Sequence, residues 1–234
     1  MATKIDWVNA VQPLLKAYKG KKHPLEYKNT YQLLVMVVLA AQDSDKHINK
    51  VAVDLFEAIP DMKALSKHTV DSLIPHIKSI RNHRNKANWL VQIANEIRKD
   101  SNIPKNLEAL TALPGIGRKS ANVILRESGR PAEGIMVDLH TVRVAPRLGI
   151  VDTADPRKIE QELMEILPQK YWDAGMAMSF HGREICRPTP LCEICFMRPV
   201  CQYYKNVVSK TPLRKEEAPK ASVKKAAKKS SAKK

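Results

Sequence analysis

The sequence predicts an all-α fold, and three features support this class. Apolar residues recur at steps of three and four along most of the chain, which is the spacing of an amphipathic helix. Proline and glycine interrupt these stretches at places that suit helix starts and ends. Only residues 135–144 alternate like a strand, and because no other segment could pair with them, we expect no sheet.

The first half of the chain contains the longest helical stretches. Residues 5–18 place apolar side chains on one face, and Pro13 is expected to kink or split that helix. Residues 31–41 are too long and too uniformly apolar for a half-exposed strand, so they predict a buried helix. Further helices are predicted over residues 46–58 and 86–99.

Two helices in the second half have recognisable ends. Asp155 and Pro156 suit the N-cap and the first position of a helix that Pro168 stops. Another helix is predicted over residues 172–180, and Gly182 is expected to close it. No internal repeat of 30–50 residues is visible.

The charge of the chain predicts a polyanionic partner. Its 40 Lys and Arg residues against 24 Asp and Glu residues give a net charge of +16. Residues 212–234 hold nine basic and two acidic residues, a local +7, which leaves +9 on residues 1–211. The basicity therefore does not all belong to the tail, and nucleic acid is the simplest partner, with an anionic membrane surface as the alternative.

Several classes of protein are excluded by the apolar pattern. The longest apolar run, Leu33 to Ala41, has nine residues, whereas a membrane span needs about 20. The N-terminus lacks the apolar core and cleavage site of a secretion signal. We therefore expect no membrane span and a cytoplasmic location, associated with the nucleoid if the protein is bacterial.

The segment from Leu107 to Leu125 carries the most informative motif. A short helix is expected to end at Leu113, a tight hairpin to follow through Gly115 and Gly117, and a second helix to start at Arg118. Two glycines permit unusual dihedrals and a close approach to another surface. Their amides would face outward at a helix N-terminus, where they could bind a phosphate. An ordinary helix–turn–helix corner with a glycine cap is the alternative.

Lys119 and Asp138 are the candidate catalytic residues. Lys119 follows Arg118 in the first turn of a helix, where the helix dipole and its neighbour disfavour a charged amine and favour a nucleophilic one. Asp138 could stabilise positive charge on a sugar or activate a nucleophile. The alternatives are a phosphate-binding lysine and a simple N-cap for a helix that Pro146 should end near Ala145.

Four cysteines lie within sixteen residues and predict a metal site. Their spacing, C-x5-C-x2-C-x5-C, suits a compact [4Fe–4S] cluster bound by four thiolates. Structural zinc is the competing interpretation, although zinc folds more often use two C-x-x-C pairs and only one is present. The expected ligands are Cys186, Cys192, Cys195 and Cys201.

Together the segment L-P-G-I-G-R-K-S-A-N-V-I-L, the downstream V-D-L-H and the cysteine cluster resemble the endonuclease III family of helix-hairpin-helix DNA glycosylases. The resemblance is collinear over about residues 22–203. It implies a two-lobed fold, with a six-helix barrel lobe over 23–133 that includes the hairpin. The second lobe would combine 1–22 with 134–211 and hold the iron–sulfur cluster. Residues 212–234 would form a disordered basic tail.

The resemblance also implies roles for single residues. Lys119 would form a Schiff base, and Asp138 would be the catalytic aspartate. Gln42 and His140 would enter the space left by an extruded nucleotide, with Asn82 in a wedge loop where the family often has an apolar residue. Leu139 replaces a threonine common in the family. Further DNA contacts are expected from Gly115, Gly117, Arg118, Arg143 and Arg187.

The activity implied is excision of oxidised or saturated pyrimidines from damaged double-stranded DNA, followed by β-elimination at the abasic site. A thymine or uracil mismatch glycosylase of the same superfamily is one alternative. A DNA-binding or DNA-scanning protein without activity is another, although the presence of both Lys119 and Asp138 argues against it. One duplex groove per chain needs no oligomer, so we expect a monomer.

Overall fold

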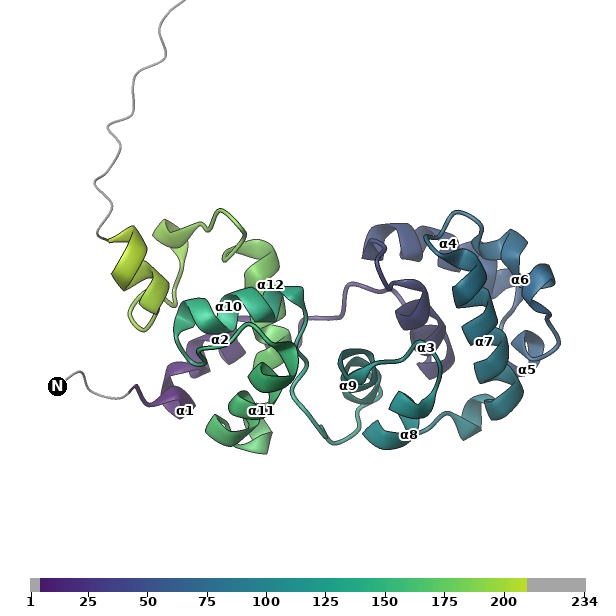
Figure 1. Cartoon of the computed structure of the whole chain (residues 1–234), viewed down its shortest axis with the longest axis horizontal. Coiled ribbons are helices and arrows are strands. Elements are labelled where there is room, and N and C mark those ends of the chain that lie inside the picture. Colours follow the sequence, from purple (N-terminus) through teal and green to yellow (C-terminus); the bar gives the residue numbers. More distant parts are fainter. Residues whose placement is uncertain (1–4, 210–234) are drawn as a thin grey trace, which may run out of the picture.

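The computed structural model describes residues 5–209, and every regular element in that range is a helix or a helical turn. The helices gather into two groups (Figure 1). The first group contains α3 (Thr30–Leu39), α4 (Asp45–Ala58), α5 (Met62–Leu65), α6 (Val70–Ile77), α7 (His83–Ile97), α8 (Leu107–Ala112) and α9 (Arg118–Glu127). The second group contains α1 (Trp7–Ala10), α2 (Gln12–Ala17), α10 (Leu139–Leu148), α11 (Pro156–Ile166) and α12 (Ala174–Glu184).

Short turns complete the described range. They are η1 (Asp100–Asn102), η2 (Gln169–Tyr171), η3 (Cys192–Ile194) and η4 (Tyr204–Val208). The chain passes between the two groups twice, once from α2 to α3 and once from α9 to α10. Within residues 5–209 no helix has the length and apolar character needed to cross a membrane. The tail predicted over 212–234 lies outside the described residues.

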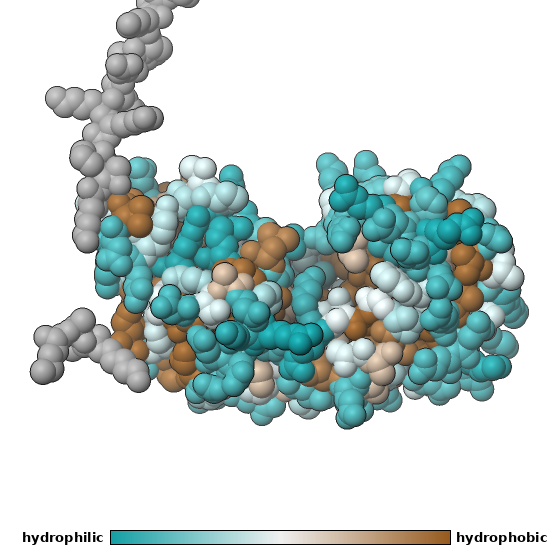
Figure 2. Space-filling view, in the orientation of Figure 1, coloured by the Kyte–Doolittle hydropathy of each residue, from teal (hydrophilic) through white to brown (hydrophobic). Residues whose placement is uncertain are grey.

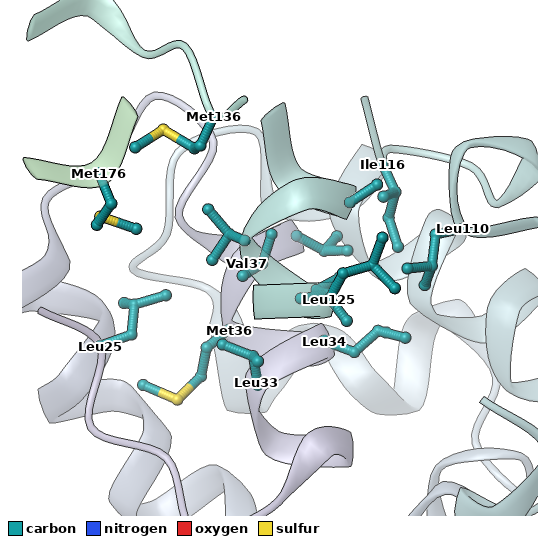
Figure 3. Packing of buried hydrophobic residues seen from close by; sticks show 14 of the residues in the cluster. Leu25, Leu33, Leu34, Met36, Val37, Leu110, Ile116, Leu125, Met136 and Met176 are labelled. Carbon is teal, nitrogen blue, oxygen red and sulfur yellow. The ribbon is translucent and has the colours of Figure 1, made fainter. Parts of the chain in front are cut away.

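Helix α3 forms the centre of the first group, as its apolar sequence predicts. Eight of its ten residues are buried, because a helix that is apolar on all sides must be enclosed by others. Helices α3 and α9 pack against each other, and Figure 3 shows Leu34 of α3 next to Leu125 of α9. The Asn29 side chain accepts a hydrogen bond from the Gln32 N–H and starts the helix one residue earlier than expected.

The N-terminal helix is split, as Pro13 predicts. Helix α1 ends at Ala10, Val11 separates it from α2, and Pro13 lies in the first turn of α2, where its missing N–H has no intrahelical partner to lose. Sequence patterning did not find α5 and α6, the first because it is only four residues long. The second contains Pro75, a residue that ordinarily argues against a helix.

Two predicted helix ends are wrong. Pro146 does not end α10, which continues to Leu148, and Gly149 closes it with a left-handed backbone (φ 87°). The Gly149 N–H donates to the carbonyls of Ala145 and Pro146, so a proline in the last turn is tolerated. Gly182 does not close α12 either, since that helix runs on to Glu184.

Gly182 instead allows α12 to pack closely on α10. A Cβ atom at position 182 would lie 2.8 Å from the Cβ of His140 and 3.0 Å from a methyl of Val144. Gly175 lies about two turns earlier on the same face of α12. A Cβ atom at this position would lie 2.3 Å from the carbonyl oxygen of Met136. The two glycines of α12 therefore provide space for the segment and helix that carry Asp138.

Replacing Gly182 with alanine should lower the free energy of unfolding by about 1–3 kcal/mol, because α10 and α12 must separate to admit the methyl group. Urea unfolding followed by circular dichroism measures the change. Gly117→Ala is the matched control, since no atom lies within 4 Å of its Cβ position and its φ of −89° suits alanine. Equal loss of stability in both variants would contradict the close-packing argument.

Candidate active site

The predicted hairpin joins α8 to α9, and its two glycines differ in backbone conformation and in the space around them. Gly115 has φ 78°, and a Cβ on it would lie 2.6 Å from the Trp89 ring. Gly117 is the N-cap of α9 in an ordinary extended conformation, so the expected unusual dihedral occurs at Gly115 alone. Both glycines are exposed. The protein's own packing explains Gly115, whereas open space at Gly117 leaves room for an external surface to approach its backbone.

The structure brings Lys119 and Asp138 to one pocket. Lys119 is exposed in the first turn of α9, and Asp138 is the N-cap of α10. The pocket leaves about 10 Å³ of room, roughly enough for one water molecule. A nucleobase does not fit inside it. Its lining consists of His23, Pro24, Lys119, Val123, Met136, Asp138, Met176, Ser179, Phe180 and Arg183.

Asp138 is held by hydrogen bonds to both of its oxygens. Oδ1 accepts from the backbone N–H groups of His140 and Thr141, each at 2.9 Å. Oδ2 accepts from the Ser179 hydroxyl on α12 at 2.6 Å. The side chain is only 8% exposed. The N-cap function that the sequence offers as an alternative for Asp138 is therefore real, and it fixes the carboxylate at the pocket.

These contacts keep Asp138 ionised. Burial alone would raise the pKa of its carboxyl group. The hydrogen bonds from Ser179 and Thr141, with the charges of His140 and Lys119, outweigh burial and hold the pKa below its usual value. The pocket thus presents a negative carboxylate close to the Lys119 amine at neutral pH.

Arg183 links the two groups of helices beside this pocket. Its Nη1 lies 2.9 Å from Oδ2 of Asp45 on α4, and its Nη2 lies 3.9 Å from Oδ2 of Asp138. Lys21 and Glu184 form another ion pair nearby. The sequence places Arg183 next to the cysteines, but the folded chain turns its guanidinium toward the carboxylates.

His23 is a pocket residue that the sequence does not reveal. Its Nδ1 accepts a hydrogen bond from the Leu25 N–H at 3.1 Å, so the proton of the neutral ring is on Nε2. Burial lowers the pKa of His23 to about 4, against the raising effect of Glu127 and Asp45. The ring is therefore uncharged at neutral pH. A lone histidine in a basic loop carries no spacing signal that could have predicted this position.

Several predicted DNA-contact residues are engaged within the protein. The Arg118 guanidinium makes two hydrogen bonds to Glu160 of α11, at 2.9 and 2.8 Å, and so ties the hairpin to the second group. Arg143 donates to the carbonyls of Cys186 and Gly182, at 3.0 and 2.8 Å. These two arginines brace the structure around the site.

His140 and Arg187 are more accessible. His140 is half-buried, and its Nδ1 lies 3.2 Å from Nη2 of Arg143, which makes Nδ1 the acceptor and Nε2 the protonated nitrogen. Burial, despite the nearby charge of Asp138, lowers the pKa of His140. Arg187 is exposed and uses only its Nε to donate to the Glu184 carbonyl.

Gln42 and Asn82 stand on two exposed turns with left-handed backbones, at φ 59° and 56°. Asparagine adopts this conformation more readily than most residues, whereas for Gln42 it costs about 1–3 kcal/mol, which the surrounding contacts must offset. Neither side-chain amide forms a hydrogen bond within residues 5–209. Asn82 is the N-cap of α7, yet its side chain does not cap the helix.

The four cysteines line one apolar cavity, and none of them forms a disulfide. Burial raises the pKa of Cys192, Cys195 and Cys201, so their thiolates need compensating positive charge. In the described range no three His, Cys, Asp or Glu side chains converge as they would on a single metal ion. The donor set is four sulfurs on the wall of one cavity, and thiolate sulfur is a ligand that both iron–sulfur clusters and zinc accept.

N–H donors surround these sulfurs. Nη1 of Arg147 lies 3.6 Å from Sγ of Cys186, and the Tyr204 N–H lies 3.5 Å from Sγ of Cys201. His181 is buried with its Nε2 3.5 Å from Sγ of Cys195. Arg147 was not singled out by the sequence, because it lies 39 residues before the first cysteine and only the fold brings the two together.

Comparison with known proteins identifies what this arrangement is similar to. Residues 35–169 match the HhH-GPD superfamily of base excision DNA repair proteins. Endonuclease III of Synechocystis sp. is 36% identical over 192 residues, covering 80% of this chain and 88% of that protein. A non-covalent endonuclease III–DNA complex has a TM-score of 0.78 at 32% identity and covers 90% and 100% of the two chains. A trapped covalent intermediate of endonuclease III with DNA gives 0.77 at 32% identity, covering 88% and 98%.

The contacts of Asp138 predict a pH-dependent contribution to stability. Asp138→Ala removes the N-cap of α10 and should lower the free energy of unfolding at pH 7 by about 1–2 kcal/mol. Because the pKa is depressed in the folded state, the charge-dependent part is present above about pH 4, the unfolded value, and disappears as the pH falls through the folded value. Urea unfolding of the variant and the wild type across this range measures the difference.

Asp138→Asn serves as the control, since asparagine is an equally good N-cap but carries no charge. It should lose less stability than Asp138→Ala at pH 7. A difference between wild type and Asp138→Ala that stays constant down to pH 3 would contradict the argument.

Proposed function

This chain belongs to the HhH-GPD superfamily of base excision DNA repair proteins and is a DNA glycosylase, and from that premise we propose that it removes oxidised or saturated pyrimidines and then cleaves the abasic site. The observation that carries the proposal is the shared pocket of Lys119 and Asp138. A glycosylase that only activates water has no need of an amine there, whereas a lysine can form a covalent bond to the sugar.

The pocket size supports extrusion of the damaged nucleotide. Chemistry on a base in a duplex requires that the nucleotide leave the stack. The room between Lys119 and Asp138 is that of a water molecule, so these side chains would meet the sugar while the base lies outside their pocket. Figure 2 shows a hollow between the two groups of helices, and the extruded nucleotide would enter there.

In the chemical step, the Lys119 amine would attack C1′ of the sugar as the C1′–N bond breaks and the base leaves with its electron pair. Asp138, kept ionised by Ser179 and Thr141, would stabilise the positive charge on the sugar and accept the proton released by the amine. The sugar then opens to an imine of Lys119. Loss of a C2′ proton and cleavage of the C3′–O bond would nick the strand, and water would release the lysine.

The DNA would be held by groups around this pocket. The exposed backbone at Gly115 and Gly117 begins α9 and would bind a phosphate, since helix N-termini favour anions. Arg187 would add a second phosphate contact. We propose that Arg118 and Arg143 act indirectly, because their guanidinium groups already bind Glu160 and the carbonyls near Cys186.

The cofactor proposed is a [4Fe–4S] cluster bound by Cys186, Cys192, Cys195 and Cys201. Four thiols on one cavity wall, with N–H donors from Arg147 and Tyr204, suit the four separate iron sites of a cluster better than one tetrahedral zinc ion. When bound, the cluster would supply a structural cross-link. Its residues lie apart from the Lys119 pocket, so we assign it no catalytic step.

Lys119→Ala should abolish covalent trapping of DNA. With sodium borohydride, the wild type is expected to form a stable adduct with duplexes that contain thymine glycol or an abasic site, because reduction fixes the lysine imine. The adduct is measured as a band of low mobility in a denaturing gel. Lys22→Ala, in the nearby loop, is the matched control for loss of one positive charge and should trap normally.

Full adduct formation by Lys119→Ala would show that another amine is the nucleophile. Duplexes with no lesion, uracil or a thymine mismatch complete the panel. Excision confined to the mismatch would contradict the proposed lesion class, and binding to all duplexes without turnover would contradict catalysis.

The purified protein should be brown and contain about four iron and four sulfide per chain. Visible absorbance together with iron and sulfide analysis measures this. Cys192→Ala should lose the colour, whereas Ser209→Ala, beyond the cysteines, should keep it. A colourless protein with one zinc ion per chain would overturn the assignment.

A further inference from the structure

The residues on either side of Gln42 and Asn82 connect the two turns on which these amides stand. We call residues 40–44 and 79–82 the probe loops. They lie about 40 positions apart in the sequence, so no local periodicity links them. Every connection described below runs from one probe loop, or the helix beside it, to the other.

Lys86 provides the first connection. Its side chain is 1% exposed, and its Nζ donates to the carbonyls of Leu39 and Ala41, at 2.8 and 2.6 Å. These carbonyls belong to the C-terminal end of α3, where a cation is favoured by the helix dipole. The Lys86 backbone N–H donates to the carbonyl of Asn82 at 3.1 Å. Lys86 therefore contacts the residue before Gln42 through its side chain and Asn82 through its backbone N–H.

Asp43 provides the second connection. Its Oδ2 accepts from the Arg81 N–H at 3.2 Å, so the residue after Gln42 binds the residue before Asn82. Its Oδ1 lies 2.8 Å from Nδ1 of His47, whose Nε2 lies 3.2 Å from the Ser79 hydroxyl. The carboxylate and the imidazole together span the gap between the loops.

The use of Asn82 argues that these contacts serve more than the stability of α7. Asparagine is among the best N-cap residues, and a helix selected for stability alone would accept a backbone N–H with that amide. Here the Asn82 amide does not cap α7, and the backbone is left-handed instead. The arrangement gives up a cap at Asn82 and leaves both exposed amides without a hydrogen bond within residues 5–209.

We propose that Asp43 and Lys86 are positioning residues that lock the probe loops into one unit, so that Gln42 and Asn82 reach the space vacated by an extruded nucleotide together. This rests on the proposed function for its DNA substrate. The contacts of Asp43 and Lys86 join the loops without any DNA, so binding would not incur the cost of arranging two separate turns. Neither residue needs to touch the DNA.

Hydrogen exchange in the DNA-free protein tests the locking directly. Asp43→Ala should speed amide exchange in residues 79–82, on the partner loop, by on the order of tenfold, which corresponds to the loss of a hydrogen bond to a charged group. Asp71→Ala is the matched control, because it removes an exposed carboxylate of the same group of helices, paired only with Arg84 at 3.6 Å. Lys86→Met, read out at residues 40–44, tests the other connection.

Kinetics separates positioning from general damage. Asp43→Ala should slow single-turnover excision from a duplex by about tenfold to a hundredfold, since small displacements of positioning groups have effects of that size. Cleavage of an abasic site in a single-stranded oligonucleotide leaves no vacated stack to fill and should change less than about twofold. Asp43→Asn, which retains an acceptor for the Arg81 N–H, should recover part of the duplex rate.

Unchanged exchange at residues 79–82 in Asp43→Ala would overturn the locking. Equal slowing of duplex excision and of single-strand abasic-site cleavage would also overturn it, because a protein that is only destabilised loses both activities together. If Lys86→Met does not fold, the Asp43 variants decide alone. A wild type that cleaves neither substrate would refute the proposed function, and the exchange result would still decide whether the loops are locked.

Discussion

The packing of α12 against α10 is the constraint on which the site depends. Gly182 lets the two helices approach until a methyl group no longer fits between them, and Gly175 does the same for the Ile135–Met136 segment that leads into α10. That approach brings the Ser179 hydroxyl to one oxygen of Asp138, while the first turn of α10 holds the other. A carboxylate fixed at both oxygens has one orientation. It also stays ionised, because burial is outweighed by its donors.

Each group of helices contributes one of the two residues, Lys119 and Asp138, to their shared pocket. Lys119 comes with α9 from the first group, and Asp138 comes with α10 from the second. Two ion pairs, Arg183 with Asp45 and Arg118 with Glu160, cross between the groups on either side of these residues. The relative position of Lys119 and Asp138 therefore depends on contacts between the two groups. The Arg118–Glu160 pair lies outside the pocket lining, whereas Arg183 also lines the pocket and lies 3.9 Å from Asp138.

The sequence predicts what local patterns encode. The hairpin, the N-cap at Asp138 and the apolar α3 all follow from short-range rules, and the structure has each of them. The two wrong helix ends, predicted at Gly182 and near Pro146, share a cause. Gly182 can end a helix or let another helix approach, and Pro146 can stop a helix or occupy its last turn. Which of these roles the residue takes depends on the neighbouring structure, which short-range rules do not include. Ser179 and Arg147 were missed because their partners are distant in the chain. His23 was missed because most of the other pocket residues are distant in the chain and a lone polar residue has no period to detect.

The narrow pocket lined by Lys119 and Asp138 limits what can lodge there. About 10 Å³ of room holds one water molecule, so neither a nucleobase nor a free sugar fits inside it. Lys119 is exposed, so any larger molecule that reaches its amine must meet it at the mouth of the pocket. Discrimination between such molecules must therefore come from contacts outside the pocket, on the surfaces that the two groups of helices present around it.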